Sequence, residues 1–119
     1  MADTLFFDTY AIIEILGKNP SYAQFTHYRM ILTKLNLFEL YYTLLRSDSR
    51  AATKWLHACA PFAIAYSTED IVAAARLKRT AKKLSMADCI GYAVAQRLEV
   101  EFLTGDKEFE HRPGVRFVK

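Results

Sequence analysis

The sequence has 119 residues, of which 52% are hydrophobic and 24% are charged. This length fits a single domain over residues 1–119 and excludes a second core of ordinary size. The net charge of +3 permits a nucleic-acid partner without requiring one. No apolar run is long enough to span a membrane, and the first residues lack the basic segment of a secretion signal, so we expect a cytoplasmic protein that does not bind membranes.

Hydrophobic spacing and helix-ending residues predict an alternation of strands and helices along the whole chain. The expected strands cover residues 4–7, 28–33, 62–66, 101–103 and 115–118. The expected helices cover residues 9–16, 35–46, 50–59, 67 to about 83, and 85–98, with a short helical turn over 21–25.

This alternation predicts an α/β fold with a mostly parallel central sheet and helices on both of its faces. In such folds ligands bind at the carboxyl ends of the strands, near the point where the strand order reverses. Acidic residues that directly follow a strand are therefore the first candidates for a functional site.

Four acidic residues occupy positions that favour a shared site. Asp8 directly follows the first expected strand, and Asp106 lies just after the strand that precedes the last one. Asp88 lies in the first turn of the last expected helix. Glu39 lies in an apolar helical stretch, where an unpaired buried charge is costly. Carboxylate oxygens suit hard cations, so a cluster of these residues is expected to bind Mg²⁺ or Mn²⁺.

Three of these acids also have an ordinary structural explanation as helix caps. Ser85 and Asp88 form the S-x-x-D pattern of a capping box. Asp8 is placed to cap the helix that follows it, and Asp106 suits either a cap or a turn. On position alone, the explanation as a cap or turn leads for Asp88 and Asp106.

Glu39 has a different explanation, which is an ion pair with Lys34 or Arg46 on the same helix. Glu14 lies one turn from the expected site, and its participation is left open. The structural explanations of the four acids are independent of one another, whereas one metal site accounts for them all. We therefore favour the metal site.

The helix over 35–46 carries more apolar residues than one buried face requires. Leu35, Phe38, Tyr42 and Leu45 share one face. Tyr41 and Leu44 add apolar groups elsewhere on the helix. Two interpretations follow, namely a helix buried on both sides or an interface with a second copy or a protein partner.

Four segments resemble the acidic motifs of the PIN-domain family. They are FFDTYAIIE, NLFELYYTLLR, LSMADCIGYAVA and FLTGDKEF, in the order of the family and over nearly the whole chain. The last two are the most specific, with Ser85 three residues before Asp88 at a helix start and a Thr-x-Asp pattern after a strand. Among PIN domains, the chain resembles the VapC toxins of VapBC toxin–antitoxin pairs.

The resemblance implies a three-layer α/β fold and a Mg²⁺- or Mn²⁺-dependent endoribonuclease that hydrolyses RNA phosphodiester bonds with metal-activated water. It also implies a VapB-like antitoxin partner and a homodimer. The catalytic metal ligands would be Asp8, Glu39, Asp88 and Asp106. The residues that support them by hydrogen bonds would be Thr9, Ser85 and Thr104. The family often has Asn or Ser where this chain has Tyr10, so the polar network around Asp8 is left open, as is the number of metal ions.

A basic segment precedes the capping box, and a further lysine follows Asp106. For any one of these residues a solvated helix face is the commoner explanation. As a group they suit contacts with RNA phosphates, which weaken with salt. The candidate RNA-binding residues are Arg79, Lys82, Lys83 and Lys107.

Other functions compete with this interpretation. A haloacid-dehalogenase-like phosphatase needs Asp-x-Asp after the first strand, whereas here Asp8 is followed by Thr9 and Tyr10. A receiver domain needs paired acids at the same place, and the single Asp8 argues against it. A PIN-fold module that only binds RNA or protein, and an RNA-processing nuclease without an antitoxin, remain as alternatives. The presence of all four acids favours a nuclease.

Overall fold

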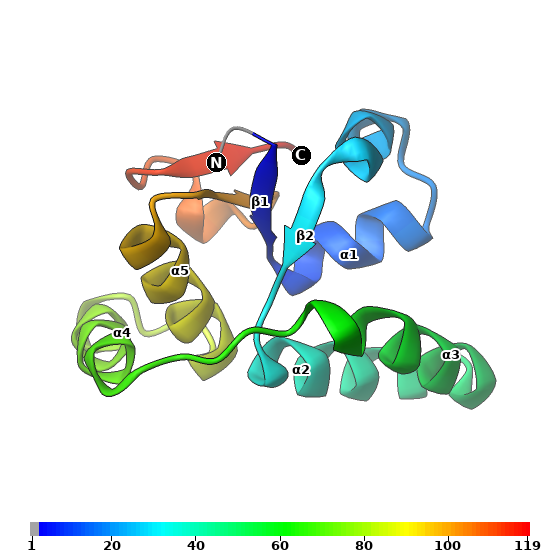
Figure 1. Ribbon diagram of the computed structural model, residues 1–119, viewed down its shortest axis with the longest axis horizontal. Coiled ribbons are helices and arrows are strands. Elements are labelled where there is room, and N and C mark those ends of the chain that lie inside the picture. Colours follow the sequence, from blue (N-terminus) through cyan, green and yellow to red (C-terminus); the bar gives the residue numbers. More distant parts are fainter. Residues whose placement is uncertain (1–2) are drawn as a thin grey trace.

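The computed structural model describes residues 3–119, which form a four-stranded sheet with helices packed around it (Figure 1). In chain order the elements are β1 (Thr4–Phe7), α1 (Thr9–Leu16), a 3-10 helix (Pro20–His27), β2 (Arg29–Ile31), α2 (Lys34–Leu45), α3 (Ser49–Cys59), a 3-10 helix (Ala60–Phe62), α4 (Thr68–Thr80), α5 (Met86–Leu98), β3 (Glu101–Thr104), a 3-10 helix (Lys107–Phe109) and β4 (Val115–Phe117). The expected α/β fold class is confirmed. Within the described residues, no helix has the length and apolar character needed to cross a bilayer.

The strands lie in the order β2-β1-β3-β4, and every pair is parallel. Phe7, the last residue of β1, pairs with Leu103 of β3. The chain leaves β1 toward β2 on one side and leaves β3 toward β4 on the other. The strand order therefore reverses between β1 and β3, and the residues that follow these two strands lie at the position where α/β folds bind ligands.

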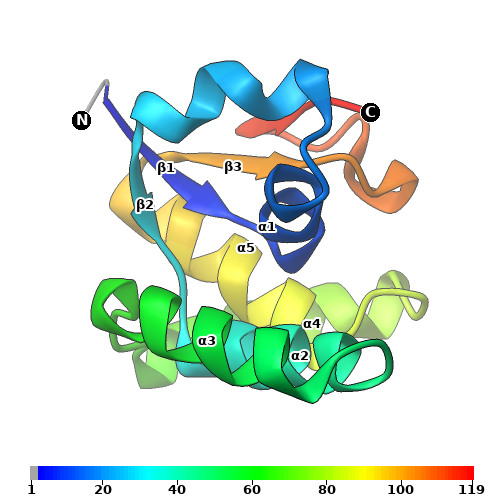
Figure 2. The same ribbon diagram turned by 90° about the vertical axis from the view of Figure 1, so that its right-hand side faces the viewer.

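Helix α5 covers one face of the sheet, and the 3-10 helix Pro20–His27 crosses the opposite face (Figure 2). A Cβ atom on Gly91 of α5 would lie 2.8 Å from the Phe6 ring, so the missing side chain lets the helix approach β1 closely. Helix α4 packs on α5, α2 contacts both α5 and α1, and α3 packs on α2. The start of α5 and the middle of α2 are thereby brought to the carboxyl end of the sheet.

The expected strand over 62–66 is wrong. This segment begins at the end of the 3-10 helix Ala60–Phe62 and touches the sheet edge through one isolated bridge, between Leu32 and Ala63. Phe62 and Tyr66 are exposed. The apolar side chains of this segment are typical of a buried strand. Among the described residues, its only neighbour in the sheet is the end of the short strand β2, which is too short to pair with five residues.

Helix α4 ends at Thr80, three residues before the expected end near Lys83. Leu84 is fully buried, and its amide donates to the Ala81 carbonyl in a turn that leaves the helix. Burial of this one leucine requires the chain to turn inward before α5 begins, which outweighs the helix-forming tendency of the lysines.

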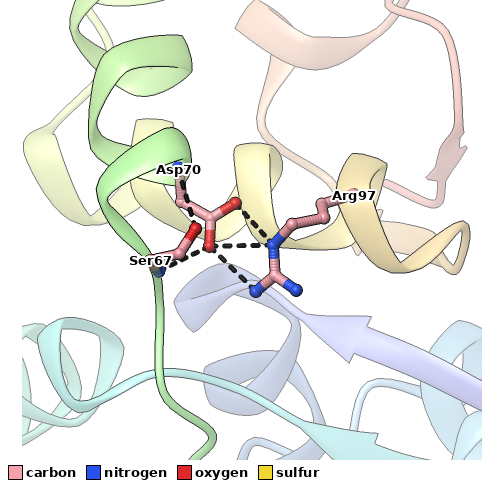
Figure 3. A network of polar contacts seen from close by, with 3 residues as sticks. All are labelled: Ser67, Asp70 and Arg97. Atoms are coloured by element: carbon pink, nitrogen blue, oxygen red, sulfur yellow. Dashed lines mark hydrogen bonds and ion pairs between the residues drawn. The ribbon is translucent and has the colours of Figure 1, made fainter.

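Helices α4 and α5 are joined by a bidentate ion pair between Asp70 and Arg97 (Figure 3). The Arg97 Nε and Nη2 atoms donate to the Asp70 carboxylate at 2.9–3.1 Å. The same carboxylate accepts from the Ser67 amide and completes the capping box of α4. These contacts lower the pKa of Asp70, with the Arg97 hydrogen bonds as the largest cause. One buried carboxylate thus fixes both the start of α4 and its packing on α5.

We expect Asp70→Asn to lower the free energy of unfolding by about 1–2 kcal/mol near neutral pH, because a buried carboxylate loses charge-assisted hydrogen bonds to a partly exposed partner. Since the folded-state pKa of Asp70 lies below the ordinary 3.8, this contribution is present above pH 3.8 and is lost as the pH falls through the lower value. Urea denaturation across pH measures the difference. Glu101→Gln, which breaks the partly exposed pair with Arg116, is the control and should change stability less. An equal loss in both variants would contradict the assignment.

Candidate active site

Asp8 is the buried centre of the site, with 2% of its surface exposed. Its amide donates to the Leu103 carbonyl at 3.1 Å, which continues the pairing of β1 with β3. Its Oδ1 accepts from the Thr9 amide at 2.9 Å and caps α1. Its Oδ2 accepts from the Thr104 hydroxyl at 2.7 Å. Both carboxylate oxygens are therefore oriented by neighbours at the ends of the two central strands.

Ser85 links the other two acids of the site. Its hydroxyl donates to Glu39 Oε2 at 2.8 Å and accepts from the Asp88 amide at 3.0 Å. The Ser85 amide donates to Asp88 Oδ2 at 2.8 Å, so the expected capping box is present. Glu39 takes part in no ion pair among the described residues, which excludes the alternative that it pairs with Lys34 or Arg46.

Asp8, Glu39 and Asp88 converge. A ligand oxygen from each lies within 4.8 Å of the others, although the residues come from the end of β1, the middle of α2 and the first turn of α5. Within residues 3–119, no other group of three or more potential metal ligands is this close. The arrangement matches the expectation that strand ends and a helix start bring these acids together.

Burial and nearby negative charge raise the pKa values of Asp8 and Asp88. Burial and the Asp88 charge raise the pKa of Asp8 well above 3.8, although the Thr104 hydrogen bond opposes this. The pKa of Asp88 is also raised, first by burial and then by the charges of Glu39 and Asp106, against the hydrogen bonds from Ser85. No described cation lies within ion-pair distance of the three. Concentrated negative charge of this kind favours a bound positive ion.

The donor set fits a divalent metal ion. Carboxylate oxygens alone suit Mg²⁺ or Mn²⁺ rather than the softer metals. The Thr9 hydroxyl is buried beside Asp8 and has no hydrogen-bond partner among the described residues. Such a group is normally satisfied by water or a ligand. Asp8, Glu39 and Asp88 are the residues that could hold the ion.

Asp106 lies outside this cluster. Its amide donates to the Thr104 hydroxyl at 3.0 Å, and its Oδ1 accepts from the Glu108 amide at 3.0 Å, capping the 3-10 helix Lys107–Phe109. It is near enough for its charge to raise the pKa of Asp88. Thr104 therefore connects Asp106 to Asp8, and the structure places the fourth expected acid at the edge of the site.

Tyr10, the residue that departs from the family pattern, fills space beside the site. A Cβ atom on Gly105 would lie 2.4 Å from the Tyr10 ring and 2.4 Å from the Val118 carbonyl oxygen. The position after Thr9 is therefore used for packing, and Gly105 must lack a side chain. Sequence reasoning missed Gly105, although its place between Thr104 and Asp106 marks a close approach of backbone.

Glu14 and Lys78 lie near the expected site, and neither belongs to the acidic cluster. Glu14 accepts from the Asn19 amide group at 3.0 Å and is not part of the acidic cluster. Lys78, which belongs to the basic segment before the capping box, donates to the carbonyls of Leu84 and Lys82 and holds the segment that precedes Ser85. The candidate RNA-binding residues are exposed on α4, on the segment after it and on the 3-10 helix after β3, namely Arg79, Lys82, Lys83 and Lys107.

In the metal-free protein, we expect stability to fall as the pH rises from 3.8 through the raised pKa of Asp8, because the folded state then holds a proton that the unfolded state has lost. Asp8→Asn should therefore raise Tm by several degrees at pH 7 in EDTA, and Mn²⁺ should stabilise the wild type more than the variant. Calorimetry with and without Mn²⁺ checks both. A variant destabilised equally in both conditions would indicate that Asp8 is only a helix cap.

Comparisons with known proteins agree with this geometry. The PIN domain family model matches residues 5–115. Among solved structures, a chain of a toxin–antitoxin complex from Klebsiella pneumoniae is 23% identical, superposes with a TM-score of 0.72, and is matched over 94% of this chain and 95% of that one. At this identity the similarity establishes the fold. No curated protein is significantly similar in sequence. Because the family match spans most of the sequence and includes both central strands, the chain belongs to the PIN domain family.

Proposed function

We propose that the protein is a Mg²⁺- or Mn²⁺-dependent endoribonuclease and the toxin of a type II toxin–antitoxin pair. The observation that carries this proposal is the convergence of Asp8, Glu39 and Asp88 within 4.8 Å at the switch point of the sheet. Members of the PIN family are generally metal-dependent nucleases. A module that only bound RNA would gain nothing from three mutually repelling carboxylates, because they also repel phosphates.

Asp8, Glu39 and Asp88 would hold the ion, and Asp106 would act from the edge of the site. When bound, a divalent ion supplies the positive charge that activates water and stabilises the leaving oxygen of a phosphodiester. The protein's own contribution is orientation. Thr104 fixes Asp8, and Ser85 fixes Glu39 together with Asp88, so the donors are arranged before the ion arrives.

The exposed basic residues supply the contacts with the RNA backbone in this proposal. Arg79 lies near the end of α4, and Lys107 follows Asp106 directly. Lys82 and Lys83 lie in the segment that leads to Ser85. These cations would offset the repulsion between the acidic cluster and the substrate phosphates.

We expect the purified protein to cleave a labelled structured RNA with Mn²⁺ or Mg²⁺ and not with EDTA. Asp8→Asn and Asp88→Asn should each reduce the rate by about a hundredfold or more, because loss of a ligand costs more than loss of a supporting hydrogen bond. Glu14→Gln is the matched control, since this acid lies one turn away and outside the cluster. Cleavage that persists in EDTA or in Asp8→Asn would contradict the proposal.

The antitoxin part of the proposal has a structural basis in an apolar groove between α4 and the start of α5. Its volume is about 470 Å³, and Arg79 lies at its rim. The similar structure from Klebsiella pneumoniae belongs to a toxin–antitoxin complex. We propose that an apolar segment of the antitoxin binds in this groove. We also propose that the chain forms a homodimer. The groove is lined by Leu35, Tyr66, Ile71, Ala74, Ala75, Lys78, Arg79, Met86, Cys89 and Ile90.

Expression of the wild-type chain should arrest bacterial growth, whereas Asp8→Asn should not. Co-expression of the antitoxin from the neighbouring gene should restore growth. Ile71→Glu should stay toxic and escape neutralisation, because a charge in the groove opposes an apolar partner. Growth curves measure these effects in four strains, which express the wild type, Asp8→Asn, the wild type with the antitoxin, and Ile71→Glu with the antitoxin. If the wild type is harmless while it still cleaves RNA, the alternative of a processing nuclease without an antitoxin is correct.

A further inference from the structure

Helix α2 presents a row of exposed aromatic and basic side chains that neither the fold nor the metal site uses. Phe38 is 72% exposed and Tyr42 is 57% exposed. Their rings are parallel, with an interplanar angle of 6° and centroids 6.3 Å apart. The face that α2 buries is a different one, formed by Asn36, Leu37 and Leu40. Of the two interpretations that the sequence left open for this helix, burial on both sides is therefore excluded.

Basic side chains lie at both ends of the two rings. Lys34, Phe38, Tyr42 and Arg46 follow one another at intervals of four residues, which places them along one side of the helix. We call these four residues the α2 row. The Arg46 guanidinium lies over the Tyr42 ring, 5.4 Å from its centroid. Among the described residues neither cation of the row is in an ion pair.

The α2 row adjoins the acidic cluster. Glu39 directly follows Phe38 and lies three residues before Tyr42, so its place on the helix is between the buried face and the row. At a rise of about 1.5 Å per residue, the row is about 18 Å long. An extended polymer chain bound along the row would pass beside the carboxylates that would hold the metal ion.

We propose that the α2 row is the binding surface for a single-stranded segment of the RNA substrate, with bases stacked on Phe38 and Tyr42 and phosphates held by Lys34 and Arg46. This inference rests on the proposed nuclease function and names the form of RNA that the site accepts. Aromatic faces combined with cations are the surface on which proteins bind unpaired strands, because every base has a stacking face and every nucleotide carries a charge. Paired RNA keeps its bases stacked inside the helix and cannot use the rings.

A second copy of the chain is the competing occupant, and the charges argue against it. In a two-fold pairing of this face, the antiparallel arrangement brings Lys34 opposite Arg46 of the copy, and the parallel arrangement brings each cation opposite its equivalent. Both arrangements place like charges together, and the row contains no acid. A polyanion meets no such repulsion.

Binding of fluorescein-labelled oligoadenylate, measured in EDTA so that no cleavage occurs, tests the proposal. We expect Phe38→Ala and Tyr42→Ala each to weaken binding about tenfold, and Tyr42→Phe to retain wild-type affinity because the ring remains. Arg46→Gln should reduce the slope of log affinity against log salt by about 0.7. Phe62→Ala, which removes an exposed ring that is not part of the α2 row, is the matched control and should bind as the wild type does.

The outcomes separate this inference from the function on which it rests. One outcome is that the wild type cleaves RNA with Mn²⁺ while Phe38→Ala and Tyr42→Ala bind and cleave RNA as the wild type does. This result would overturn the RNA-binding role of the α2 row and leave the nuclease function intact. Equal affinity for oligoadenylate and for its duplex with oligouridylate would also overturn it. Sedimentation that shows the alanine variants losing dimers with unchanged RNA affinity would assign the row to an interface between copies. A wild type that neither binds nor cleaves RNA would overturn both proposals.

Discussion

The parallel pairing of β1 with β3 is the constraint on which the rest of the structure depends. It places Asp8 beside Thr104, although these residues are separated by 96 positions in the sequence, and it leaves both at the carboxyl edge of the sheet. A shift of one residue in this register would turn Asp8 away from the Thr104 hydroxyl. The close approach of α5, permitted by Gly91, then brings Asp88 to the same edge.

The acidic cluster opposes folding, and the packing around it supplies the compensation. Burial and neighbouring negative charge raise the pKa values of Asp8 and Asp88, and a bound cation would relieve that repulsion. The surrounding structure holds them in place through a filled core of large side chains such as Phe6, Phe102 and Phe109. The ion pair between Asp70 and Arg97 fixes the start of α4 against the last turn of α5. Stability elsewhere in the fold thus sustains a site that is unfavourable by itself.

Much of this organisation could be predicted from the sequence, because its signals are local. The S-x-x-D capping box and the Gly17 end of α1 depend on residues within one turn of each other. The segment over 62–66 was predicted as a strand because apolar residues look alike whether a strand partner exists or not. Periodicity finds the apolar stripe of α2 without saying which side meets the core, so the sequence alone leaves open both burial on two sides and an exposed interface. Asn36 is buried through its bonds with Thr33, and no hydrophobic pattern places an asparagine inside. The contact of Asp8 with Thr104 required the tertiary fold.

Three of the four acids serve as helix caps as well as belonging to the site or its edge. Asp8 caps α1, Asp88 caps α5 and Asp106 caps a 3-10 helix, whereas Glu39 caps nothing. Selection for folding alone would therefore preserve a capping side chain, either Asp or Asn, at these three positions in a lineage without catalysis. Glu39, which caps no helix, is the acid that such a lineage would lose first.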